Sequence, residues 1–219
     1  MINQRRTVCF YCALILRVAT IFGGACQLFG CSAQPARIVG VKIDVQRAAE
    51  RIIAEFDKDH DGNLSQDELA AVPAINVHRK WYDADHNGQI SQEELRKGLR
   101  DIFNPKDGLL SVACEVTRNG QPLSGAFVKF VPMPELDGAI PPASGVTDSH
   151  GTTFLNLANE DRPKNTPPKI PVVRPGLYLV EVTHDQIKIP EEYNSKTEIG
   201  KEVSGFTTAG GALKIQLKF

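Results

Sequence analysis

The sequence predicts an α+β multidomain protein, in which an N-terminal helical segment precedes an antiparallel β-sandwich. Two opposite patterns of apolar residues carry this prediction: they recur at helical spacing within residues 41–103 and alternate with polar residues within residues 109–219. Residues 104–108, Asn-Pro-Lys-Asp-Gly, separate the two patterns and have the composition of a linker. With 42% hydrophobic residues, both parts have enough apolar material for a core.

The charges of the chain nearly cancel. The sequence holds 25 lysines and arginines against 26 aspartates and glutamates, a formal net charge of −1. Proteins that bind the phosphate backbone of nucleic acids carry a clear basic excess, so we expect no nucleic-acid partner. The acidic residues concentrate in residues 41–103, which hold 13 acidic and 9 basic side chains.

Residues 1–30 predict a secretory signal peptide. Arg5 and Arg6 precede an apolar run from Val8 to Gly30 that only Arg17 interrupts. A transmembrane anchor is the alternative, but a guanidinium at mid-membrane costs roughly 3 kcal/mol, which favours export.

The end of this run, Leu28-Phe29-Gly30-Cys31-Ser32, resembles the lipobox of bacterial lipoproteins. The resemblance implies lipidation of Cys31 and an exported, membrane-anchored lipoprotein at the periplasmic or cell surface. Plain cleavage of the signal near this point is the alternative. In either case Cys114 is the one cysteine left beyond Cys31, and its place on an alternating apolar face predicts a buried thiol.

An amphipathic helix is expected from Val45 to Phe56, with Asp44 as its N-cap. The residues that follow resemble the calcium-binding loop of the EF-hand, in which alternate oxygen-bearing side chains converge on one hard cation. Gly62 provides the sharp turn at the sixth position. The predicted ligands of this first loop are Asp57, Asp59, Asp61, the Asn63 carbonyl, Ser65 and Glu68.

A second copy of the loop begins 26 residues later, with Gly88 at its turn. Leu64 and Ile90 hold equivalent eighth positions, so we expect the two loops to pair through a short β-bridge. The predicted ligands of the second loop are Asp83, Asp85, Asn87, the Gln89 carbonyl, Ser91 and Glu94. The sequence therefore predicts two Ca²⁺ sites in an EF-hand pair over residues 41–103.

A simpler interpretation treats the loops as acidic turns in which Ser65 and Glu68, then Ser91 and Glu94, form capping boxes. Capping boxes do not explain the acidic or amide residues at the first, third and fifth positions of both loops. His60 and His86 fall on the non-ligating fourth positions, so no zinc role is expected. Pro73 between the loops predicts short linking helices, a compact arrangement that resembles bacterial EF-hand pairs.

The pattern of residues 109–219 resembles the transthyretin-like, carboxypeptidase-regulatory-like domain of secreted proteins from planctomycete-type bacteria. Three motifs carry the resemblance: the Arg118–Gln121 hairpin, the Thr147–Gly151 turn and the Pro175–Tyr178 strand start. Expected strands include Thr152 to Leu157 and Leu177 to Thr183. The resemblance implies a β-sandwich and brings no catalytic set.

No group of residues predicts catalysis. The five histidines show no ligand spacing, and a nucleophile with a base in reach is not evident. We therefore expect a non-catalytic calcium-binding exported lipoprotein, with calcium structural for the EF-hand pair and the sandwich serving as a surface binding or spacer module. The alternatives are a calcium-responsive protein-interaction module, with an apolar face around Trp81 and Ile75, and a polysaccharide-binding accessory domain. Possible partners are a membrane, through the lipid anchor, and a cell-surface protein or glycan.

Overall fold

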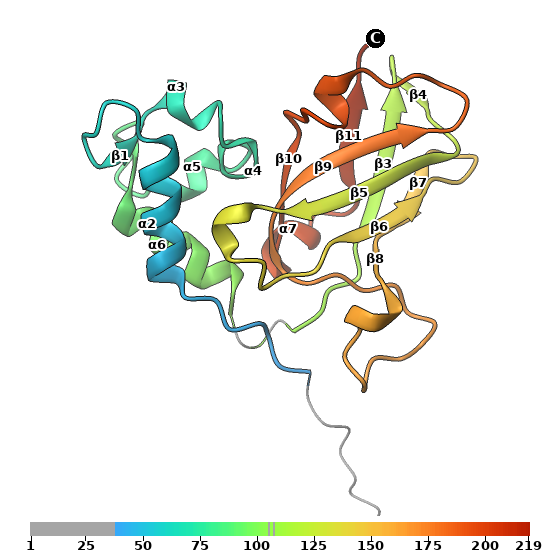
Figure 1. Ribbon diagram of the computed structural model, residues 1–219, viewed down its shortest axis with the longest axis horizontal. Coiled ribbons are helices and arrows are strands. Elements are labelled where there is room, and N and C mark those ends of the chain that lie inside the picture. The colour runs from blue at the N-terminus through green and yellow to red at the C-terminus, as the bar shows by residue number, and fades with distance from the viewer. Residues whose placement is uncertain (1–37, 105, 107) are drawn as a thin grey trace, which may run out of the picture. The chain divides into compact units, whose positions relative to one another are not determined.

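The computed structural model describes residues 38–104, 106 and 108–219 (Figure 1). The predicted signal peptide and Cys31 lie outside the described residues. Two groups of elements follow one another along the chain, first mostly helices and then mostly strands, so the α+β class is confirmed. No helix of the described residues has the length and apolar character required to cross a bilayer.

The first group begins with the predicted helix. Helix α2 (Val45–Phe56) starts directly after Asp44, whose side chain accepts a 3.1 Å hydrogen bond from the backbone N–H of Arg47. Its buried face holds two alanines and two isoleucines at helical spacing. The group comprises α2 (Val45–Phe56), β1 (Asn63–Leu64), α3 (Gln66–Leu69), α4 (Pro73–Asn76), α5 (Arg79–Tyr82), β2 (Ile90–Ser91) and α6 (Gln92–Ile102).

The predicted pairing of the two loops is confirmed. Strands β1 and β2 are antiparallel, with Leu64 opposite Ile90, and both side chains are buried. The short linking helices are confirmed as well, since α3, α4 and α5 each span four residues, and Pro73 occupies the first turn of α4.

The second group forms two sheets. Five strands follow the order β10-β9-β5-β6-β8, and β11-β3-β4 form the other sheet, with β7 also paired to β3. The strands are β3 (Ala113–Arg118), β4 (Gln121–Pro122), β5 (Ala126–Pro132), β6 (Ala143–Val146), β7 (Thr152–Phe154), β8 (Asn156–Leu157), β9 (Gly176–His184), β10 (Gly200–Val203) and β11 (Leu213–Leu217). The remaining helical turns are η1 (Pro134–Leu136), η2 (Asn159–Asp161), η3 (Glu191–Tyr193) and α7 (Gly205–Thr208).

Two expectations about these strands need correction. The sheets are not entirely antiparallel, because β11 runs parallel to β3. Parallel neighbours need a long crossover connection, and the chain from β4 to β10 supplies it. The strand expected over Thr152 to Leu157 is divided: β7 pairs with β3, whereas β8 pairs with β6 in the other sheet. The buried Leu155 lies at this change of sheet.

Helix α4 packs against β10 and β9, so the helical and strand groups share an interface (Figure 1). At this interface Gly200 of β10 lies so close to α4 that an added Cβ atom would be 2.0 Å from the backbone nitrogen of Ala74. Arg51 of α2 forms a second connection through an ion pair with Asp137, directly after η1.

Candidate metal centre

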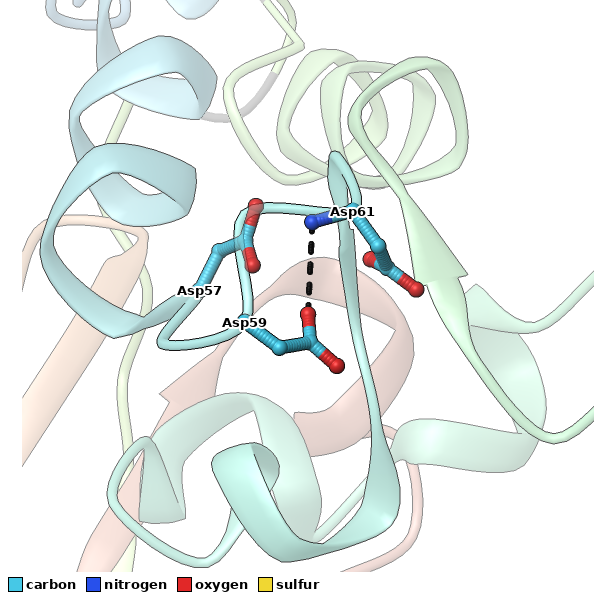
Figure 2. A group of neighbouring side chains, drawn as sticks. All are labelled: Asp57, Asp59 and Asp61. Carbon is cyan, nitrogen blue, oxygen red and sulfur yellow. Dashed lines mark hydrogen bonds between the residues drawn. The ribbon is translucent and has the colours of Figure 1, made fainter.

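The first acidic loop brings three aspartates together at the end of α2. One carboxylate oxygen each from Asp57, Asp59 and Asp61 lies within 4.8 Å of the others (Figure 2). Asp57 is buried, and its Oδ2 accepts a 2.9 Å hydrogen bond from the backbone N–H of Gly62. Gly62 has a φ of +86°, which a residue with a side chain adopts only with strain.

Hydrogen bonds between residues two positions apart hold the shape of the loop. The N–H of Asp61 donates to Oδ1 of Asp59 at 3.2 Å (Figure 2). The N–H of Asn63 donates to Oδ1 of Asp61 at 2.8 Å. These turns coil the chain, so that alternate side chains gather on the inside. Negative charges at these distances repel one another, and a bound cation would reduce this repulsion.

Glu68 closes the first loop from its far end. Its Oε1 accepts a 2.7 Å hydrogen bond from the N–H of Lys58, and its Oε2 accepts from both the N–H and the hydroxyl of Ser65. These hydrogen bonds lower the pKa of Glu68 to about 2. The bond from the Ser65 N–H has the largest effect, followed by those from the Ser65 hydroxyl and the Lys58 N–H. The carboxylate is therefore ionised at neutral pH.

The second loop repeats this arrangement. One oxygen each from Asp83, Asp85 and Glu94 lies within 4.8 Å of the others. Asp83 accepts from the N–H of Gly88 at 3.0 Å, as Asp57 does from Gly62, and Gly88 has a φ of +88°. Burial acts to raise the pKa of Glu94, but hydrogen bonds from Ser91 and from the N–H groups of Ala84 and Asp85 lower it below its ordinary value.

Both predicted capping boxes are present. Ser65 and Glu68 cap α3 reciprocally, and Ser91 and Glu94 do the same for α6. The capping and metal-binding interpretations are thus compatible, since the same glutamate can close the loop and start the helix. His60 and His86 are exposed and occupy left-handed backbone positions, with φ values of 59° and 61°.

The donor set of the first loop fits a hard cation. Oδ1 of Asp57 is buried and has no hydrogen-bond partner among the described residues. A buried carboxylate oxygen without a donor is unfavourable, and a cation bound between the three aspartates would satisfy it. The predicted ligands Asn63, Ser65, Asn87, Gln89 and Ser91 also lie in the two loops, and the Gln89 side chain reaches Oδ2 of Asp61 across the pair at 3.5 Å.

Comparison with known proteins supports this assignment. The EF hand family matches residues 50–73 and 82–99, two segments that contain both acidic loops. No curated protein and no solved structure matches the chain. The family match and the two carboxylate clusters together indicate an EF-hand pair that binds calcium.

Tyr82 is an important residue that the sequence analysis did not identify. It immediately precedes Asp83, as Phe56 precedes Asp57, and its buried ring packs against Gly98 of α6. Its hydroxyl donates to Glu202 of β10 at 3.1 Å. The change from phenylalanine to tyrosine between equivalent loop positions was the available signal, because a buried hydroxyl requires a partner.

The residues of the predicted apolar face differ in exposure. Trp81 is 39% exposed, whereas Ile75 is fully buried in the core. Of these two residues, only Trp81 is available to a partner.

Proposed function

We propose that this chain is a non-catalytic calcium-binding exported lipoprotein, in which calcium stabilises the EF-hand pair and the strand region acts as a surface binding or spacer module. The observation that carries the calcium role is the repeated carboxylate cluster; in its first copy the buried Oδ1 of Asp57 has no hydrogen-bond partner among the described residues. Export, lipidation of Cys31 and the transthyretin-like β-sandwich rest on the sequence resemblances described above.

In this proposal each loop supplies oxygen ligands to one Ca²⁺ ion. The ligands would be Asp57, Asp59, Asp61, Asn63, Ser65 and Glu68 in the first loop, and Asp83, Asp85, Asn87, Gln89, Ser91 and Glu94 in the second. The ion would neutralise the mutual repulsion of the carboxylates and fix the two loops against their shared β-bridge. Calcium sites of extracellular proteins are often weak, on the order of 10⁻⁴ to 10⁻³ M, which is sufficient where calcium is abundant.

Three features support a structural role for calcium rather than a sensor role. Sensor EF-hands open a methionine-rich groove when they bind calcium. The chain has two methionines, Met1 and Met133, and neither lies in residues 41–103. Helix α4, the middle one of the three short helices between the two loops, packs against β10 and β9, and Ile75 within α4 is fully buried.

The deciding experiment is a calorimetric titration with calcium in the presence of millimolar magnesium. The parent chain is compared with a variant carrying Glu68→Ala and Glu94→Ala and with a control carrying Asp67→Ala and Glu93→Ala. Both variants lose two negative charges, but only the first removes predicted ligands. We expect two equivalents of calcium to bind to the parent and to the control, and none to the ligand variant. A folded parent that binds no calcium would refute the proposal.

A further inference from the structure

A groove of about 730 Å³ lies between the α4–α5 segment and β10. Pro73 and residues 76–81 line it from the helical region, and residues 198–201 line it from the strand region. The groove is separate from the acidic loops, and neither carboxylate cluster contributes to its lining.

Two basic residues of α5, Arg79 and Lys80, line the groove, together with one acidic residue, Glu198. Neither basic side chain forms an ion pair with a carboxylate of the described residues. Residues 41–103 are acidic overall, so the adjacent Arg79 and Lys80 form a local reversal of charge. Unpaired cations in a concave site complement an anionic ligand.

Trp81 connects the groove to an exposed aromatic surface beside it. The Trp81 ring stacks on the Phe206 ring, with centroids 6.2 Å apart and planes inclined by 23°. Phe206 is 73% exposed, and Val77 beside Trp81 is 51% exposed. Tryptophan and arginine, which occur together in this concave site, are the residue types that often contribute most to protein–protein binding energy.

We propose that this groove, the Trp81 groove, binds an acidic segment of a partner protein. Carboxylates of that segment would lie against Arg79 and Lys80, and one apolar side chain would pack against the Trp81–Phe206 stack. A nucleic acid is disfavoured, because it requires a longer basic surface than two cations provide. An acidic polysaccharide offers carboxylates but no apolar side chain for the stack. The proposal goes beyond calcium binding and does not depend on it.

Trp81 is the single tryptophan of the chain, so intrinsic fluorescence reports directly on this groove. The full chain, at saturating calcium, is titrated with a short peptide of glutamate and aspartate with a central leucine. The same titration is made with polygalacturonate and with the peptide in which every acidic residue is replaced by lysine. We expect a saturable change in Trp81 fluorescence with the acidic peptide, weakened by added salt, and none with the lysine peptide.

Variants then locate the binding site. Arg79→Gln combined with Lys80→Gln should weaken peptide binding by about tenfold, whereas Lys164→Gln combined with Lys169→Gln, in an exposed loop, should leave it unchanged. Phe206→Ala removes one ring of the stack, retains the reporter and should also weaken binding. Circular dichroism confirms that each variant is folded.

The proposal is overturned by any of three results: no saturable response to the acidic peptide, an equal loss in the loop variant, or tighter binding of polygalacturonate than of the peptide. A chain that binds no calcium can still bind the peptide, so the two proposals fail independently.

Discussion

The hydroxyl of Tyr82 donates a 3.1 Å hydrogen bond to Oε2 of Glu202, although the two residues are 120 positions apart in the sequence. Both side chains are buried, and Oε1 of Glu202 accepts a second hydrogen bond from the Ser204 hydroxyl at 2.8 Å. Burial, followed by the negative charge of Glu202, raises the pKa of Tyr82 well above its ordinary value. Since Tyr82 directly precedes Asp83, this contact connects the second acidic loop to β10.

Replacement of Tyr82 by phenylalanine should destabilise the protein. The substitution keeps the ring against Gly98 but leaves a buried carboxylate with one donor fewer, at a cost of about 1–3 kcal/mol in the free energy of unfolding. Urea denaturation measures the change. Tyr193→Phe is the matched control, because the Tyr193 hydroxyl makes only exposed hydrogen bonds of 3.3 Å: it donates to the Lys218 carbonyl and accepts from the Lys218 N–H. Equal losses in the two variants would show that the Glu202 contact has no special role.

A methyl group at Gly200 should separate α4 from β10. The added Cβ atom would lie 2.0 Å from the Ala74 nitrogen and 2.2 Å from the Pro73 carbonyl carbon, and neither backbone atom can move without shifting the helix. We expect Gly200→Ala to lower the free energy of unfolding by about 1–3 kcal/mol. Gly210→Ala is the control, since its nearest contact would be the Thr207 oxygen at 3.5 Å. Thermal melts measure the change. If the two variants had the same melting temperature, the result would contradict the close packing of α4 on β10.

Local chemistry made much of this structure predictable. The N-cap at Asp44, the two capping boxes, the Leu64–Ile90 bridge and the buried Cys114 each depend on residues near one another in sequence or on a short period. The turn at Asn119 and Gly120 belongs to this class, since both residues have positive φ, as a tight hairpin requires.

Long-range relationships could not be predicted in the same way. The parallel pairing of β11 with β3 joins the two ends of the strand region, and no local pattern specifies a partner at that distance. The strand expected over Thr152 to Leu157 alternates as one strand does, but the chain changes sheets at Leu155. The Tyr82–Glu202 contact and the close approach at Gly200 likewise depend on how α4 packs on β10.

The thiol of Cys114 should react only after unfolding. Cys114 is fully buried in β3, and its pKa is raised to about 12, mainly because of this burial. The reactive thiolate is therefore scarce at pH 8, and reagent has no access to the sulfur. Treatment with iodoacetamide, followed by mass analysis of the peptide containing Cys114, should show labelling in urea and almost none in buffer. Rapid labelling of the native chain would contradict the buried position.

Removal of calcium should destabilise the strand region as well as the EF-hand pair. Ligand binding to the native state adds about 2.7 kcal/mol per site to the free energy of unfolding when the free ligand concentration is a hundred times the dissociation constant. The Tyr82–Glu202 and α4–β10 contacts connect the helical region to the sheets, so the sheets share this gain.

Two reporters lie in the two regions: Trp81 fluorescence follows the helical region, and Cys114 labelling follows β3. We expect a chelator to shift both urea transitions to lower concentration by the same amount, in the parent and in the Asp67→Ala, Glu93→Ala control. The Glu68→Ala, Glu94→Ala variant should not respond to calcium or chelator in either reporter. A shift of the Trp81 transition alone would show that calcium stabilises the EF-hand pair without stabilising the sheets.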